Sequence, residues 1–223
     1  MCANYLPSKA EQLQGHFGVA APDSSYVAES FPGTLSPLIR KPRAQASFGE
    51  RSAALAMFGM VPHWAEKKLA RHTYNARSET LAVKPSFRNA FKLAQFCVVP
   101  AEAIFEPCYE TGKAQRFAIR RADGAPLGIA GIWERKPGRG DEMPLLSFSM
   151  LTINADEHPL MQRFHKSGDE KRMLVFLHPE RYDDWLHCPL AAAHEFFVPY
   201  PAELLVAQPA ARPAQATLEL PDA

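Results

Sequence analysis

Short apolar runs that stop at turn residues constrain this chain most, because they favour strands and leave little room for long helices. The run Ala54–Val61 stops at Pro62, and the run Phe96–Phe105 leads directly into Glu106. Apolar runs of this length, bounded by Pro, Gly and Asp, are typical of buried strands. Phe96–Phe105 is therefore the strongest strand that the sequence predicts.

Further strands are expected on both sides of this run. They are Leu35–Ile39, Gln115–Ile119, Leu127–Trp133, Leu145–Ile153 and Met173–Leu177. The Asp123-Gly124 pair favours a tight hairpin between the second and third of these. Ser8 marks the start of a short helix over 8–18, and Pro179 marks another over 179–187. With about six strands and few helices, the sequence predicts an α+β fold: a single β-rich domain with an open or barrel-like mixed sheet and peripheral helices.

The composition changes once along the 223 residues. After about residue 198, Ala, Pro and Gln dominate and periodicity is lost. We expect one folded domain over 1–197 and a Pro/Ala-rich C-terminal tail over 198–223. No apolar run approaches the roughly 20 residues of a membrane span, and Met1–Tyr5 lacks the features of a signal peptide. Four scattered cysteines are too few for a disulfide framework, so a reduced, cytoplasmic protein is expected.

Charge is distributed unevenly. Residues 40–92 contain eleven Lys and Arg against three acids, a net +8, although the whole chain carries only +1. Such a segment can neutralise phosphates and release counterions on binding nucleic acid. Trp64 and other aromatic residues are interleaved with it, and stacking on exposed bases would use them. A solvated basic face over core aromatics explains the same pattern.

Cys2 is the most informative position for chemistry. Removal of Met1 would leave a chain that begins with a cysteine, whose α-amine and thiol lie on adjacent carbons. An α-amine with a reference pKa of about 7.7–8.0 is partly neutral and nucleophilic near pH 7. This 1,2-aminothiol can condense with an aldehyde to a Schiff base, which the sulfur then closes to a thiazolidine. An incidental cysteine at position 2 is the other interpretation.

Two further residues suit proton transfer. Glu106 emerges among apolar neighbours, which should raise its pKa. His165 lies in a polar connection before the last strand, and histidine suits acid–base work at neutral pH. A salt-bridged strand end and an ordinary surface histidine are the alternatives. The sequence contains no Cys-x-x-Cys, no His-Glu-x-x-His and no phosphate-cradling glycine loop, so neither a metal nor a cofactor is expected.

Taken together, these features follow an ordered pattern. The pattern consists of Met1-Cys2, Phe31-Pro32-Gly33-Thr34, Gly59–Trp64, Asn75–Thr80, Pro100-Ala101-Glu102 with Phe105-Glu106, Leu151-Thr152 with Ala155-Asp156, and His165 through Arg172-Met173. The chain thereby resembles the SRAP (SOS response-associated peptidase) family of abasic-site processing proteins over roughly residues 2–190. The N-terminal cysteine and the Asn-Ala-Arg-x-Glu-Thr segment are its most specific parts.

The resemblance implies a DNA-damage function. Family members cross-link the N-terminal cysteine to the ring-opened aldehyde of abasic sites in single-stranded DNA, and the peptidase label corresponds to self-removal of Met1. It implies that Cys2 is the nucleophile, that Asn75 orients it, and that Glu106 and His165 move protons. It implies DNA contacts from the following residues: Trp64, Arg77, Thr152 and Arg172. A monomer, associated with the nucleoid if bacterial, and a possible strand-cleaving lyase activity are further expectations.

The chain departs from the family pattern in several places. Ala3-Asn4 replaces Gly-Arg, Pro107-Cys108 replaces a tryptophan, and 166–171 lengthens the connection from His165 to Arg172. Two other functions stay open at this point. One is an amidohydrolase that uses Cys2 as N-terminal nucleophile, and the other is a single-strand-binding module in which Cys2 has no role.

Overall fold

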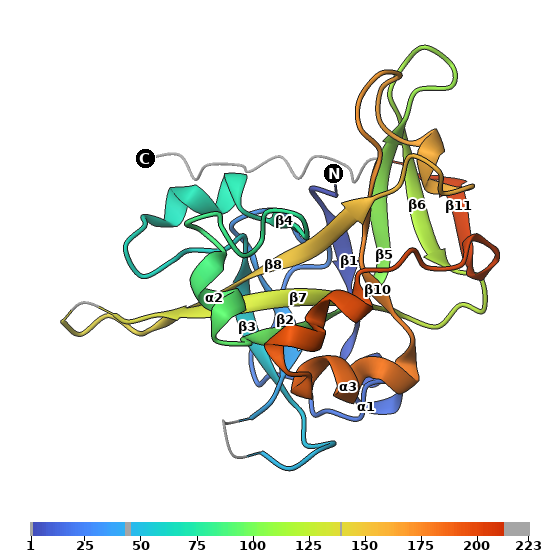
Figure 1. Cartoon of the computed structure of the whole chain (residues 1–223). Coiled ribbons are helices and arrows are strands. Elements are labelled where there is room, and N and C mark those ends of the chain that lie inside the picture. Colours follow the sequence, from blue (N-terminus) through green and yellow to red (C-terminus); the bar gives the residue numbers. More distant parts are fainter. Residues whose placement is uncertain (1, 43–45, 139, 212–223) are drawn as a thin grey trace, which may run out of the picture.

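The computed structural model describes residues 2–42, 46–138 and 140–211 (Figure 1). These residues form eleven strands in one sheet. The strands are β1 (Tyr5–Pro7), β2 (Leu35–Arg40), β3 (Ser52–Phe58), β4 (Asn75–Arg77), β5 (Phe96–Cys108), β6 (Gln115–Arg121), β7 (Leu127–Lys136), β8 (Leu145–Asn154), β9 (Arg172–Leu174), β10 (Phe176–Leu177) and β11 (Leu205–Pro209). The strands predicted from apolar runs are thus present.

Helices are short and lie outside the sheet, as expected. The α-helices are α1 (Ala10–Gly15), α2 (Arg88–Lys92) and α3 (Tyr182–His187), and the 3-10 helices are η1 (Lys67–His72), η2 (Met161–Arg163), η3 (Pro179–Arg181), η4 (Leu190–Phe196) and η5 (Ala202–Leu204). The helix predicted over 8–18 starts later than expected. Ser8 does not cap it, because the Ser8 N–H donates to the Pro100 carbonyl at 3.1 Å and keeps this residue beside the sheet.

Five strands close into a barrel. Following hydrogen-bonded neighbours, the ring runs β5, β7, β8, β3, β2 and back to β5. The β3–β8 pairing is parallel and the other four are antiparallel, so the barrel is mixed. The sequence prediction of a β-rich α+β domain with a barrel-like mixed sheet is therefore confirmed, in its closed form.

The predicted hairpin between β6 and β7 is wrong. The turn at Asp123-Gly124 exists, with Gly124 at φ +77°, but the two strands pair with different halves of β5. β7 pairs with residues 96–101 of β5, and β6 pairs with residues 104–108. β5 is thirteen residues long, so one strand can serve two partners in succession. Pro100, which has no N–H to donate, lies close to the point where the partner changes.

Part of the segment predicted as a tail belongs to the sheet. β11 pairs antiparallel with β6, from Leu205 opposite Arg121 to Pro209 opposite Phe117. Residues 212–223 lie outside the described residues. The domain boundary at residue 197 stays a prediction.

Aromatic side chains fill the barrel and attach the helices to it. The Phe58 ring stacks on Phe148 at 5.4 Å between centroids, and both are fully buried. At one end, the Trp185 indole of α3 donates to the Cys97 carbonyl of β5 at 2.9 Å. Figure 1 shows α1 and α3 together at the lower end of the barrel and the N-terminal end of the chain on the opposite side. The end of the barrel near residue 2 is therefore not covered by α1 or α3.

Gly59, which follows β3, offers a test of this packing. Its φ is +104°, and a Cβ there would lie 2.2 Å from the Ala70 carbonyl oxygen. We expect Gly59→Ala to lower the unfolding free energy by about 3 kcal/mol or more, since backbone strain and a backbone clash add. Gly124→Ala is the matched control, because its φ of +77° gives the same strain in open space. We expect about 1–2 kcal/mol there, and equal losses in urea denaturation would contradict the packing at Gly59.

Candidate functional site

The N-terminal segment places Cys2 inside the protein. β1 pairs antiparallel with β5, with Tyr5 opposite Ile104. The pairing continues toward the N-terminus, where the Phe105 N–H donates to the Asn4 carbonyl at 3.2 Å. Cys2 is 1% exposed, and its thiol donates to the Asn4 carbonyl at 3.2 Å. Because β5 carries Glu106 next in sequence after Phe105, strand pairing brings residue 2 beside this carboxyl.

Asn75 fixes the backbone of Cys2 from the other side. β4, which begins at Asn75, runs parallel to β8. The Asn75 side-chain amide donates to the Cys2 carbonyl at 2.8 Å. The side-chain oxygen of Asn75, Oδ1, is buried, and among the described residues it has no hydrogen-bond partner. This oxygen is the kind of buried acceptor that a group of the substrate or of the processed N-terminus can satisfy.

Glu106 and His165 form a buried acid–base pair. Glu106 Oε2 lies 3.3 Å from His165 Nε2, and the Glu106 side chain is 2% exposed. His165 adopts φ +65°, unusual for a residue with a Cβ. The His165 N–H donates to the Pro107 carbonyl at 2.8 Å, which helps hold this backbone beside β5. The unusual conformation turns the imidazole toward the carboxyl one residue earlier on the strand.

Burial sets the protonation of these groups. Loss of solvent raises the pKa of Glu106 to about 7 and lowers the pKa of His165 to about 4. The pKa of the Cys2 thiol rises to about 12, because the thiol is buried and the Glu106 carboxylate lies nearby. Near neutral pH, His165 is uncharged, the thiol keeps its proton, and Glu106 divides between acid and carboxylate. Glu106 is thus the group of the three best able to accept and return a proton at this pH.

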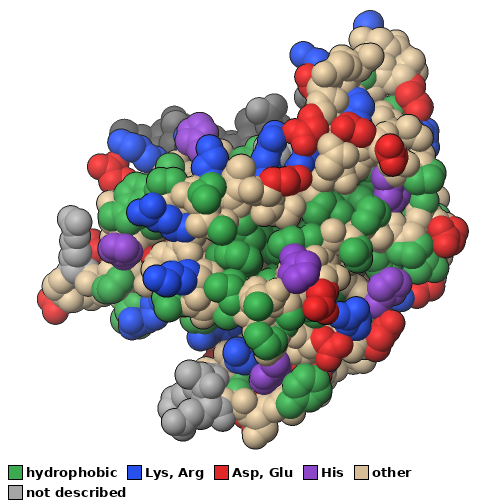
Figure 2. All heavy atoms as spheres, viewed as in Figure 1, with side chains coloured by type: hydrophobic (Ala, Val, Ile, Leu, Met, Phe, Trp, Pro, Cys, Tyr) green, Lys and Arg blue, Asp and Glu red, His purple; other side chains and the backbone are tan. Residues whose placement is uncertain are grey.

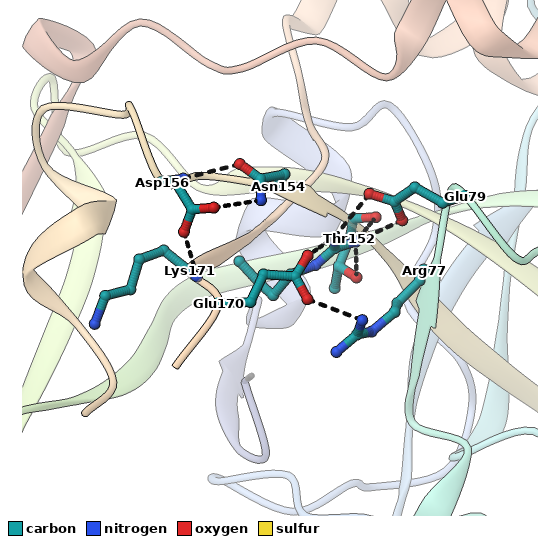
Figure 3. Close-up of polar contacts among 8 residues, drawn as sticks. Arg77, Glu79, Thr152, Asn154, Asp156, Glu170 and Lys171 are labelled. Atoms are coloured by element: carbon teal, nitrogen blue, oxygen red, sulfur yellow. Dashed lines mark hydrogen bonds and ion pairs between the residues drawn. The ribbon is translucent and has the colours of Figure 1, made fainter. Parts of the chain in front are cut away.

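The predicted DNA-contact residues Arg77, Thr152 and Arg172 form a second cluster, because Arg172 donates to Thr152 and Glu170 pairs with both arginines. Figure 3 shows Arg77, Thr152 and Glu170 of this cluster. Arg77 lies two residues after Asn75 on β4, and its side chain is 47% exposed. Arg172 is buried, and its Nη2 donates to the Thr152 carbonyl at 2.9 Å and to the Thr152 hydroxyl at 3.2 Å. β4 joins this cluster to the Cys2 site, since strand periodicity points Asn75 and Arg77 to the same face.

Trp64 lies apart from both clusters in the loop between β3 and η1. It is 56% exposed. It lines a pocket of about 470 Å³ with Ala65, Glu66, Lys68, Leu69, Arg71 and His72. An exposed indole beside basic side chains suits base stacking, but within the described part of the chain it shares no hydrogen bond or ion pair with Cys2.

Sequence reasoning missed three acids in these clusters. Glu79 and Glu170 both bind the Arg172 guanidinium, and Glu29 accepts hydrogen bonds from Asn4 and Arg116. Glu79 lies within the Asn-Ala-Arg-Ser-Glu-Thr segment, so its presence in the motif was a usable signal. Neither Glu29 nor Glu170 lies in a motif that points to its partners. Arg116, a partner of Glu29, and Arg77, a partner of Glu170, come from distant parts of the chain, whereas Arg172 lies two residues after Glu170.

Across residues 2–42, 46–138 and 140–211, no group of three or more His, Cys, Asp or Glu is arranged to hold a metal ion. Among the helices described, none is long and apolar enough to cross a membrane.

A known protein family matches nearly the whole chain, and individual relatives match more than half of it. A family model described as SOS response associated peptidase (SRAP) matches residues 1–213. The abasic site processing protein YoqW of Bacillus subtilis (strain 168) is 30% identical over 132 residues, 58% of this chain and 55% of that protein. The abasic site processing protein YedK of Escherichia coli (strain K12) is 33% identical over 129 residues, 58% of this chain and 52% of that protein. The alignments thus span about half the length of these relatives.

Solved structures agree with the fold. A crystal structure of a protein from Bordetella bronchiseptica has a TM-score of 0.85 and 40% identity, and covers 95% of this chain and 100% of that one. A protein from Bacteroides thetaiotaomicron has a TM-score of 0.76 at 20% identity, covers 92% of this chain and 90% of that one, and shows the fold alone. With a family model that matches nearly its whole length, the chain belongs to the SRAP family.

Proposed function

We propose that this protein senses abasic sites in single-stranded DNA and cross-links Cys2 to their ring-opened aldehyde. The observation that carries the proposal is the buried Cys2 held between Asn75 and the Glu106–His165 pair. The names of the relatives YoqW and YedK support abasic sites as the target. Removal of Met1, the proposed peptidase step, precedes this chemistry because the α-amine of Cys2 must be free.

The order of the steps follows from the protonation states. The α-amine, with a reference pKa of about 7.7–8.0, attacks the C1′ aldehyde first, since the thiol keeps its proton. One water leaves as the carbon–nitrogen double bond forms. The thiol then adds across that bond: sulfur bonds to C1′, Glu106 takes the thiol proton, and the nitrogen receives a proton in turn. The product is a thiazolidine, and the whole reaction releases one water.

His165 and Asn75 have supporting roles in this scheme. Neutral His165, whose pKa burial lowers to about 4, donates or accepts a hydrogen bond at Nε2 according to its tautomer. At 3.3 Å from Glu106 it can pass a proton to or from the deoxyribose oxygen. Asn75 holds the Cys2 carbonyl, which fixes the direction of the amine and thiol.

Exposed positive charge favours binding of a DNA strand along the outside of β4 and α2. Among the described residues of the segment 40–92, seven basic side chains are exposed: Lys67, Lys68, Arg71, Arg77, Lys84, Arg88 and Lys92. Figure 2 shows Lys and Arg side chains gathered on the left of this face, over η1 to α2, and Asp and Glu mainly on the right. Phosphate contacts from these residues, with Trp64 stacking on bases, would hold the strand independently of the thiol.

Replacing Cys2 tests the covalent step. The protein is mixed with a uracil-containing single strand treated with uracil-DNA glycosylase, and intact masses are measured. We expect wild-type protein lacking Met1 to gain the DNA mass minus one water, only with the treated strand. Cys2→Ala keeps the amine but cannot close the ring, so its adduct should require borohydride trapping of the Schiff base. Strand affinity should change less than about 2-fold, since the basic face is intact.

Cys188→Ala is the matched control, because Cys188 is a partly exposed thiol in a different part of the chain. It should cross-link like wild type. A stable adduct from Cys2→Ala without reductant would contradict the proposal. Turnover of small amides without strand binding would indicate the amidohydrolase, and strand binding with no adduct from protein lacking Met1 would indicate a non-covalent binding module.

The pH dependence tests Glu106. Its pKa is raised to about 7, so the proton-accepting carboxylate forms as pH rises through 7, and the cross-linking rate should rise with it. Glu106→Gln removes this group, so the rate should fall by about 10²-fold or more. The inflection that remains in the rate profile should then reflect titration of the Cys2 α-amine, near pH 7.7–8.0.

Glu102→Gln on the same strand provides the control, because Glu102 is paired with Lys9 at 3.6 Å rather than with the site. Its rate and pH profile should match those of wild type. The role assigned to Glu106 is wrong when Glu106→Gln retains both the wild-type rate and the inflection near pH 7.

A further inference from the structure

Glu79 and Thr152 hold the Arg172 guanidinium in place and leave one side of it for another partner. Its Nη1 and Nη2 donate to the two oxygens of Glu79 at 2.7 and 2.9 Å, a bidentate pair. Thr152 takes two further hydrogen bonds from Nη2. The Arg172 side chain is 3% exposed. Glu79 and Thr152 are therefore sufficient to fix this guanidinium, and additional partners of Nη1 are not needed to hold it.

Glu170 nevertheless occupies that side of Arg172 and also reaches Arg77 (Figure 3). Glu170 Oε1 accepts from Arg172 Nη1 at 2.7 Å, and Glu170 Oε2 lies 2.9 Å from Arg77 Nη1. Each carboxylate oxygen thus faces a different guanidinium. Two arginines that share the two oxygens of one anionic group are also well placed to share the two unesterified oxygens of a phosphodiester.

The charges of this cluster favour exchange of one anion for another. Arg77, Arg172, Glu79 and Glu170 sum to zero, so an additional phosphate gains little attraction while Glu170 stays in place. Displacement of Glu170 leaves a net positive charge that one phosphodiester neutralises. Glu170, in the exposed connection 166–170, holds Arg172 with one oxygen, whereas Glu79 holds it with both, so Glu170 has fewer contacts with Arg172 to give up.

We propose that Glu170 fills a phosphate-binding site between Arg77 and Arg172 in the unbound protein, and that a backbone phosphate of the DNA strand displaces it. The inference rests on the proposed function, since it assigns the strand as ligand. The same connection begins at His165, five residues before Glu170, beside Glu106.

The affinity of the Glu170→Gln variant for single-stranded DNA tests this inference. Binding of an unmodified fluorescent single strand is measured by anisotropy between about 50 and 200 mM salt. We expect Glu170→Gln to bind about 3- to 10-fold more tightly than wild type at low salt, the range of a partly exposed charge pair. Its salt slope should steepen by about 0.7, because wild-type binding exposes a carboxylate that takes up a cation.

Glu195→Gln is the matched control, since it makes the same change in net charge at an exposed position of η4. It should bind like wild type, and thermal unfolding should show both variants folded. Equal affinities of Glu170→Gln and Glu195→Gln, or weaker binding by Glu170→Gln, would overturn the inference. An unmodified strand needs no cross-link, so the result is independent of Cys2: a failed cross-link with tighter Glu170→Gln binding rejects the covalent chemistry alone. Absence of strand binding by wild type and Glu170→Gln alike overturns the inference about the phosphate site, while the mass measurement with the abasic strand decides the covalent chemistry separately.

Discussion

The candidate site depends on the pairing of β1 with β5. Three residues of β1 are enough to draw the N-terminal segment along the sheet, and the Phe105–Asn4 hydrogen bond extends the pairing toward Cys2. Without it, Cys2 would be the second residue of a free chain end, whose position costs entropy to fix. With it, the thiol is buried next to Glu106 and Asn75 before any ligand binds. β5 contributes through its length: its thirteen residues allow this one strand to pair with β7, β2, β1 and β6.

Burial of this site changes the chemistry available to ordinary side chains. An exposed glutamate is ionised and an exposed cysteine partly reactive near neutral pH. Inside the barrel wall, the pKa of Glu106 and that of the Cys2 thiol both rise, while that of His165 falls. All three shifts have desolvation as their first cause, and all three favour the uncharged form. The same burial that weakens ionisation therefore leaves Glu106 poised to exchange a proton near pH 7.

Two kinds of positive charge lie near this site. The exposed lysines and arginines from η1 to α2 are available to phosphates at long range and are sensitive to salt. Arg172, in contrast, is buried and occupied by two carboxylates, with Arg77 sharing one of them. The first set can attract a strand, while the second set requires a phosphate at a defined position. In the proposed function, this division separates general affinity for nucleic acid from placement of the strand relative to Cys2.

The sequence by itself predicted the strands and the β-rich class, because apolar runs are local signals. It also singled out Cys2, Asn75, Glu106 and His165 through a motif with unusual residues; the structure brings them together, and their catalytic roles stay a prediction. It misplaced the hairpin of β6 and β7, since an Asp-Gly turn specifies a reversal but not the partner of each strand. It assigned no role to Glu29, Glu79 or Glu170. Only the tertiary structure decided that β11 joins the sheet, that Arg172 is buried, and that Glu170 bridges it to Arg77. The pairing of β11 with β6 and the contacts of Arg172 with Glu79 and of Glu170 with Arg77 join residues far apart along the chain, and their energies depend on burial and distance rather than on any neighbouring sequence pattern.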